Sequence, residues 1–228
     1  MFLPVALLLY YAVPFRFKNA VLFLTGLLFY AWGEPVYVLI MILSTLIDYC
    51  AGRVMDKFDS NKSIRKVALI VSVVMNLSLL GVFKYSGFFV ESINSVFGNV
   101  MNNPNLPLPI GISFFTFQSM SYTIDLYRRN IKVQKNFINF AAFVTMFPQI
   151  VAGPIVLYDD VARELENRKI DIDSISNGIS VFICGLCKKV LIANSVGELW
   201  TTVKASDYSP PPAATAWLGI IAFTLQIY

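Results

Sequence analysis

The sequence predicts an all-α, polytopic transmembrane helical bundle, and three observations lead to it. Of the 228 residues, 57% are hydrophobic and only 14% are charged, with a mean hydropathy of +0.65. Because a soluble domain carries about a quarter charged residues, this chain has too few to cover a water-facing surface. Three stretches contain no charged residue at all, namely 92–124, 136–158 and 208–228. Backbone groups cannot stay unpaired in lipid, so such spans are predicted to be helices.

The apolar segments differ in length, and some are short for a crossing that takes about 20 residues. We expect about six to eight membrane segments, some of them short or re-entrant. Their approximate ranges are 2–14, 19–33, 35–52, 67–90, 107–127, 137–158, 175–197 and 213–228.

The positions of Lys and Arg predict the orientation, since cytoplasmic loops carry an excess of both. Basic residues occupy alternate connections, at 16–18, 53–66 and 128–135, whereas 33–35 and 98–106 contain none. The basic connections are therefore expected to be cytoplasmic and the amino terminus outside, through residue 136. Beyond residue 136, the connection 159–173 contains both acidic and basic residues. Its charge therefore does not indicate on which side of the membrane it lies.

The domain organisation is expected to be simple. No repeat, low-complexity tract or linker divides 1–228, so the chain is predicted to form part of a single transmembrane domain. Segment 213–228 is apolar to its last residue, with no charge or flanking polar residues. We expect a truncated chain that represents the amino-terminal part of a longer domain.

A polar stripe runs along the segment that follows Pro107 and Pro109. Its members recur at helical spacing and therefore share one face: Gln118, Ser121, Tyr122, Asp125 and Arg129. In a membrane this face must meet protein or water. One interpretation is helix–helix contact, with Asp125 pairing Arg128 or Arg129 at the interface. The other makes Gln118 and Asp125 part of a substrate-channel wall.

A second pattern interrupts the segment 137–158. Pro148 and Pro154 each lack a backbone donor and break a helix, Gly153 adds flexibility, and Gln149 brings an amide to membrane depth. Broken backbone is tolerated there where it is buried in protein or lines a cavity. Pro148, Gln149, Gly153 and Pro154 are therefore candidates for lining a tunnel, with a plain proline kink as the alternative.

A third pattern combines Cys184, Cys187, Lys188 and Lys189. One CxxC pair in a chain with no His makes a poor metal site, so we expect no metal and interpret the cysteines as small buried thiols. Lys188 and Lys189 are expected to extend to lipid headgroups, or alternatively to meet an anionic group such as a cofactor phosphate.

Other charged groups and motifs suggest little chemistry within these residues. Asp48 and Lys84 lie near span ends and are expected to be interfacial. No phosphate-binding loop, Ser/His/Asp set or paired-carboxylate site is present, and the absence of His excludes His-based catalysis by these 228 residues. No nucleic-acid partner is expected.

Four ordered blocks, however, resemble those of bacterial membrane-bound O-acyltransferases, and most of all the alginate O-acetyltransferase-like branch. They are FYAWGEP (29–35) with LSTLIDY (43–49), PIGISFFTFQ (109–118), FPQIVAGP (147–154) and GLCKKV (185–190). The D-alanyl transfer protein of teichoic acid synthesis is a more distant likeness. The resemblance covers essentially the whole chain.

The resemblance implies a multi-pass enzyme of the bacterial plasma membrane that moves an acyl group, such as acetyl, from a cytoplasmic thioester to a cell-surface or exported polysaccharide. The donor would be acetyl-CoA or an acyl carrier, used as substrate, with no bound cofactor. The polysaccharide would be reached directly or through an extracytoplasmic acetyltransferase partner. The family's catalytic residue is a His in the carboxy-terminal half, so no catalytic residue is assigned here and the 228 residues alone are expected to be inactive.

Two other classes fit the residues. Broken helices and a polar stripe also occur in small-solute transporters and channels. A non-catalytic membrane partner in a polysaccharide export complex would have the same composition. Thioester-dependent acetylation distinguishes the enzyme from the transporter, and a His within a later membrane segment distinguishes it from the non-catalytic partner.

Overall fold

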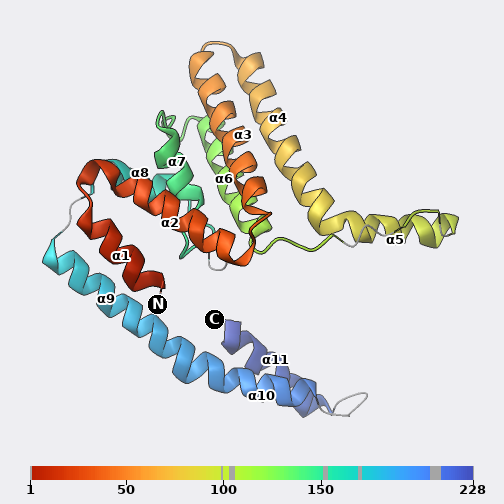
Figure 1. Cartoon of the computed structure of the whole chain (residues 1–228). Helices are drawn as coiled ribbons and strands as arrows, with labels where there is room; N and C mark the ends of the chain where they lie inside the picture. The colour runs from red at the N-terminus through yellow and green to blue at the C-terminus, as the bar shows by residue number, and fades with distance from the viewer. Residues whose placement is uncertain are drawn as a thin grey trace. The chain divides into compact units, whose positions relative to one another are not determined.

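The computed structural model describes residues 2–98, 100–102, 106–150, 154–168, 171–205 and 212–227, and the secondary structure in these ranges is helical (Figure 1). The residues form two compact units, 1–168 and 169–228. Within these described ranges, three helices are long and apolar enough to cross a membrane: Val38–Lys57, Lys62–Phe97 and Ile172–Lys204. Together with shorter apolar helices, they confirm the predicted membrane helical bundle. The expectation of a single domain stays a prediction.

The described residues of the first unit form eight α-helices. They are α1 (Phe2–Ala12), α2 (Lys18–Gly33), α3 (Val38–Lys57), α4 (Lys62–Leu80), α5 (Ser86–Phe97), α6 (Ile112–Arg128), α7 (Phe137–Val144) and α8 (Tyr158–Asn167). Of these, α1, α2, α3 and α6 begin and end within about five residues of predicted segments. Local chemistry sets several of these boundaries. The side chain of Asn61 accepts hydrogen bonds from the first backbone amides of α4, and that of Asn136 does so for α7. Gly111 begins α6 with a φ of 75°, which favours glycine.

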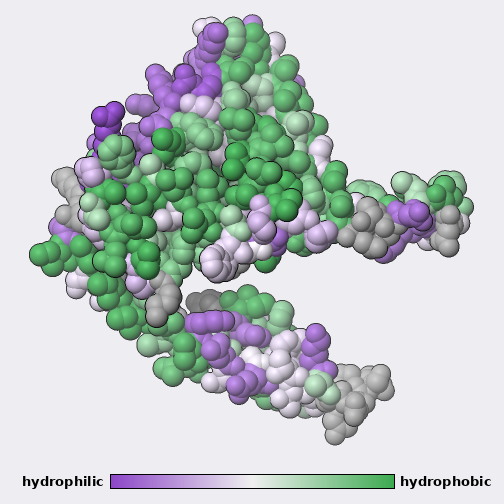
Figure 2. Space-filling model, viewed as in Figure 1, coloured by the Kyte–Doolittle hydropathy of each residue, from purple (hydrophilic) through white to green (hydrophobic). Residues whose placement is uncertain are grey.

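The core of this unit forms where α6 packs between α3 and α4. Its fully buried side chains include Met41, Met55, Phe115, Tyr122 and Phe140. The outer faces of the same helices are apolar as well, as shown by Leu39 and Val67, which are 67% and 59% exposed. In Figure 2 the hydrophilic residues of this unit gather above, over the connection between α3 and α4, while hydrophobic surface covers the flank of α4. Such a surface is suited to lipid.

The segment 62–97 bends where the sequence predicted one apolar segment, 67–90. Gly81–Tyr85 is a π-helical segment between α4 and α5, and Figure 1 shows α5 turning away from the axis of α4 there. Helices commonly bend at such a bulge. Lys84 lies in the bend, where its ammonium contacts Ser113 Oγ at 3.4 Å.

Two of the basic connections, 53–66 and 128–135, meet on one face of the first unit. Asp59 forms ion pairs with Arg65 at 2.5 Å and with Arg129 at 3.2 Å, which joins the α3–α4 connection to the end of α6. Arg53 donates to the carbonyl of Lys135 at 3.0 Å. The charge pattern placed these connections on the same side of the membrane, and the contacts agree with that placement.

Residues 137–158 do not form one span. α7 has eight residues and a length of about 12 Å, which is less than half of a hydrocarbon core of about 30 Å. The helix ends near Thr145, and the chain reaches α8 only at Tyr158. The side chain of Gln134 then joins the α6–α7 connection to α8 by donating to Tyr158 Oη at 2.8 Å and to Glu166 at 3.1 Å. The segment therefore enters and leaves at the face of the basic connections, as a re-entrant element does.

A cysteine-labelling experiment tests the resulting topology. Single cysteines at Ser60 and Asn103, introduced into a chain without its native cysteines, are expected to react from opposite sides of the membrane, because basic residues are confined to the connection that contains Ser60. Asn103 itself lies outside the described residues. Accessibility of both positions to an impermeant maleimide from one side would contradict the orientation.

The second unit is an apolar helical hairpin. It contains α9 (Ile172–Cys187), a π-helical segment (Lys188–Ala193), α10 (Asn194–Lys204) and α11 (Ala213–Ile227). Two glycines allow α10 and α11 to approach closely, as small residues do in membrane helices. A β-carbon on Gly197 would lie 2.8 Å from Gln226 Nε2, and one on Gly219 would lie 2.9 Å from Val203 Cγ1.

Candidate functional site

The most polar part of the interior is a set of side chains shared by α3, α4 and α6. Its centre is Asp48 on α3, which is 0% exposed. Asn76 on α4 donates to Asp48 Oδ1 at 2.8 Å, and Ser72 donates to the same oxygen. Ser44 donates to Asn76 Oδ1 at 2.6 Å, and Thr123 on α6 lies 3.2 Å from Ser72 Oγ. We call Ser44, Asp48, Ser72, Asn76 and Thr123 the polar cluster.

The structure corrects the expectation that Asp48 is interfacial. Asp48 lies near the end of a predicted span, but α4 and α6 pack over it and bury it in the interior. Within the described residues Asp48 forms no ion pair, and its Oδ2 has no hydrogen-bond partner. Ser44 and Asp48, like Ser72 and Asn76, are four residues apart and lie on one helix face. That shared spacing was the signal available in the sequence.

Substitutions at Asp48 distinguish hydrogen bonding from charge. Asp48→Leu is expected to destabilise the first unit by about 1–3 kcal/mol, because Asn76 and Ser72 lose their acceptor in a dry interior. Asp48→Asn keeps an acceptor oxygen for Asn76 and Ser72 and removes a buried charge, so it should be tolerated better than Asp48→Leu. Thermal unfolding in detergent measures both. Equal losses for the two variants would show that the carboxylate charge itself is required.

Gln118, the first candidate on the polar stripe, is buried and donates to the carbonyl of Phe143 at 3.1 Å. It thus joins α6 to α7, as the helix-contact interpretation describes. Tyr122, from the same stripe, is fully buried and accepts from the backbone amide of Gln134 at 3.0 Å. Hydrogen bonds of this kind connect helices where lipid offers no partner.

Asp125 does not form the expected pair with Arg128 or Arg129. Its Oδ1 accepts from Asn130 at 3.3 Å, while Arg129 pairs with Asp59. The reason lies in the backbone, because Arg129 ends α6 with a left-handed φ of 65° and leaves the helical spacing that the sequence argument assumed.

The proline break contains the remaining candidates of the first unit. Pro148 and Pro154 are exposed, Gln149 is half-buried, and Gly153 lies outside the described residues. The Oε1 atom of Gln149 is buried and has no hydrogen-bond partner within the described part of the chain. Beside it, Ile150 is 0% exposed and belongs to the core. Gln149 is thus a buried polar group whose structural role no contact in the described residues explains.

Tyr158 and Gln134 were missed by sequence reasoning. Tyr158 stacks edge-on against Tyr122 at 5.0 Å and against Phe143 at 5.3 Å. Burial raises the pKa of the Tyr158 hydroxyl, with a smaller contribution from Glu166. The phenol therefore stays neutral at physiological pH and accepts from Gln134. No motif indicated this group, since it depends on the return of the chain after the break.

The basic face contains a pocket of about 310 Å³. It is lined in part by Asp59, Arg65, Arg129, Lys132 and Lys135. Asp59 holds both arginines, whereas Lys132 and Lys135 form no ion pair within the described residues. The two ammonium groups therefore remain available to an anion.

Lys188 and Lys189 are exposed in the π-helical segment of the second unit. Among the described residues neither has an ion-pair partner, so both interpretations of them stay predictions. Cys184 and Cys187 are also exposed on the helix surface and not buried as expected, because no other element of their unit covers that face. The described residues contain no group of three or more His, Cys, Asp or Glu side chains that could hold a metal ion.

Comparison with known proteins gives matches along the whole length of the chain. It is 36% identical to probable alginate O-acetylases of Pseudomonas syringae pv. tomato and Pseudomonas aeruginosa, and 28% identical to a peptidoglycan O-acetyltransferase of Helicobacter pylori. The chain is a relative of the alginate O-acetylases. It spans about half the length of these proteins, 44% of the two alginate O-acetylases and 49% of the third. No protein-family model matches, and no solved structure matches.

These matches confirm the resemblance read from the four sequence blocks. These relatives are named for O-acetyl transfer to different acceptors, alginate in two of them and peptidoglycan in the third. An O-acetyltransferase implies an acyl donor as substrate, in agreement with the sequence prediction.

Proposed function

We propose that the complete protein is a membrane-bound O-acyltransferase of the bacterial plasma membrane. It transfers acetyl from a cytoplasmic thioester, acetyl-CoA or an acyl carrier, to a hydroxyl of an exported or cell-surface polysaccharide. The observation that carries the proposal is the match to O-acetyltransferases over all of the chain. The catalytic base would be a His outside these 228 residues, which contain none.

The described part of the chain supports three tasks in such an enzyme. A helical bundle keeps the reacting thioester away from bulk water, which would otherwise hydrolyse it. The re-entrant segment around Gln149 places inside the bundle a buried amide oxygen, Oε1, that has no hydrogen-bond partner among the described residues. Lys132 and Lys135 line a pocket on the face expected to be cytoplasmic, where the phosphates of a donor would arrive. Transfer to the polysaccharide outside then proceeds directly or through an extracytoplasmic acetyltransferase partner.

Acetyl transfer by the complete gene product tests this function. Inverted membrane vesicles that contain the full-length protein and enclose a uronic-acid polysaccharide in their lumen are supplied with radiolabelled acetyl-CoA on their outer, cytoplasmic face. We expect label in the polymer as a base-labile ester, above the level of vesicles without the protein. Uptake of acetate or polymer without ester formation would favour a transporter, and neither activity would favour a non-catalytic partner.

A further inference from the structure

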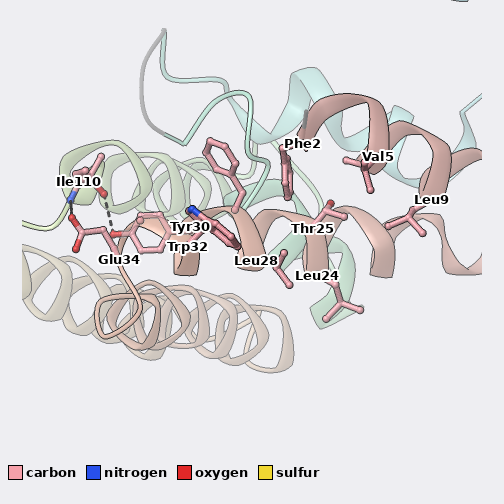
Figure 3. Close-up of a pocket in the computed structure, with 13 residues that line it drawn as sticks. Phe2, Val5, Leu9, Leu24, Thr25, Leu28, Tyr30, Trp32, Glu34 and Ile110 are labelled. Atoms are coloured by element: carbon pink, nitrogen blue, oxygen red, sulfur yellow. Dashed lines mark hydrogen bonds between the residues drawn. The ribbon is translucent and has the colours of Figure 1, made fainter.

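A long apolar groove lies between α1 and α2, with a volume of about 790 Å³ (Figure 3). Phe2, Val5 and Leu9 line it from α1, and Leu24 and Leu28 line it from α2. Figure 3 shows Phe2 and Val5 pointing from α1 toward α2, while Leu24 and Leu28 extend from α2 on its other side in this view. Phe2 stacks on Phe29 at a centroid distance of 5.2 Å and closes the groove on one side.

The polar groups of the groove are satisfied, with one exception. Thr25 donates to the carbonyl of Val21 at 2.7 Å, and the hydroxyl of Tyr30 donates to the carbonyl of Ile110 at 2.9 Å. The half-buried carboxylate of Glu34 receives one contact, from the amide of Ile110 at 3.5 Å, which is at the limit of a hydrogen bond. Glu34 forms no ion pair within the described residues. The groove is therefore lined mainly by apolar side chains and has one carboxylate, that of Glu34, at one end.

The length of the groove corresponds to one leaflet of a bilayer. Leu24 and Glu34 are ten residues apart, so α2 rises about 15 Å between them, which is half of a hydrocarbon core of about 30 Å. Trp32, at the same end as Glu34, is 90% exposed. Exposed Trp is typical of the membrane interface, so this end belongs at the level of the headgroups. The connection that contains Glu34 has no Lys or Arg, which assigns it to the outer leaflet.

We propose that the groove binds one acyl chain of an outer-leaflet phospholipid and that Glu34 binds its amine headgroup. Phosphatidylethanolamine has the required chemistry, because its primary ammonium can form a charge-assisted hydrogen bond with the carboxylate. Phosphatidylglycerol has the same chains but no cation, so Glu34 would repel its phosphate. The preference arises from charge complementarity at one end of a site that is otherwise purely apolar. It does not depend on the proposed transfer activity.

Photo-crosslinking in vesicles tests the proposal with the full chain. Phosphatidylethanolamine and phosphatidylglycerol probes, each with a diazirine in the acyl chain, are added in equal trace amounts. Peptides from α1 and α2 should be labelled by the ethanolamine probe about threefold to tenfold more than by the glycerol probe. Glu34→Gln should make the two probes equal, because it removes the charge and keeps the size of the side chain.

A second pair of variants tests the groove itself. Leu28→Trp fills the groove and should lower labelling by both probes, whereas Leu39→Trp, on the exposed face of α3 outside the groove, should leave it unchanged. Elution from size exclusion at the wild-type volume establishes that each variant is folded. Equal labelling of the wild type by both probes would overturn the role of Glu34. Labelling insensitive to Leu28→Trp, or absent from α1 and α2, would overturn lipid binding and indicate that another protein segment covers the groove.

Discussion

Replacing Gly26 with alanine is expected to lower the stability of the first unit by about 2–3 kcal/mol or more. The reason is a close approach of α2 to the end of α7. A β-carbon on Gly26 would lie 2.0 Å from the carbonyl oxygen and 2.8 Å from the carbonyl carbon of Thr145. These are backbone atoms of a residue that is 1% exposed, so neither a rotamer change nor a small shift relieves the overlap. The two elements must separate.

Gly33→Ala is the matched control for this prediction, because Gly33 ends the same helix and an added β-carbon meets nothing within 4 Å. Both variants gain the higher helix propensity of alanine, so their difference isolates the packing effect. Thermal unfolding in detergent should give a midpoint roughly 5–10 °C lower for Gly26→Ala than for Gly33→Ala. Equal midpoints would show that α2 and α7 do not approach as closely as described.

Gln149→Leu is expected to lower acetyl transfer by the complete protein about tenfold or more, the cost of one lost polar contact to a buried group. The hypothesis is that the proline break lies beside the acyl-transfer tunnel and that Gln149 faces it. The observation that supports this hypothesis is the buried Oε1 atom of Gln149, which has no hydrogen-bond partner in the described residues. Because no hydrogen bond to that atom is lost, the thermal stability should stay close to that of the wild type.

Gln118→Leu gives the opposite pattern and serves as the comparison. Gln118 has a defined partner, so its loss leaves the buried carbonyl of Phe143 unsatisfied and should cost stability, about 1–3 kcal/mol. Ile150→Leu, next to Gln149, keeps the volume of a core residue and should change activity little. Full activity and normal expression of Gln149→Leu would mean that the break is a structural kink.

The helices of this chain were predictable because their signal is local. Charge-free runs and the alternation of basic connections placed α1, α2, α3 and α6 within about five residues, and Pro148 and Pro154 indicated the break after α7. The depth of Asp48 was not predictable in this way. Position along the chain suggests an interface, but burial depends on which faces of α4 and α6 cover that residue.

The same distinction holds for ion pairs. Helical spacing suggested that Asp125 meets an arginine of its own helix, whereas Arg129 pairs with Asp59, 70 residues away. Such a pair becomes visible only when the connections of one membrane face are brought together. The charge pattern also left open on which side of the membrane α8 lies. In the structure, Gln134 of the 128–135 connection donates hydrogen bonds to Tyr158 and Glu166 of α8, so α8 lies beside that basic connection.

Arg65 has a consequence for the order in which the chain assembles during synthesis. Its guanidinium binds Asp59 and donates at 3.0 Å to the carbonyl oxygens of Leu126 and Tyr127, at the end of α6. Leu126 follows Arg65 by 61 residues. The guanidinium donor that binds the end of α6 is therefore already present on the α3–α4 hairpin before α6 leaves the ribosome. A hairpin that ends after Leu80 should thus resist proteolysis in the membrane by itself. Arg65→Lys should delay the later docking of α6, since one ammonium cannot replace the planar guanidinium that donates to four acceptors, two on the hairpin and two at the end of α6.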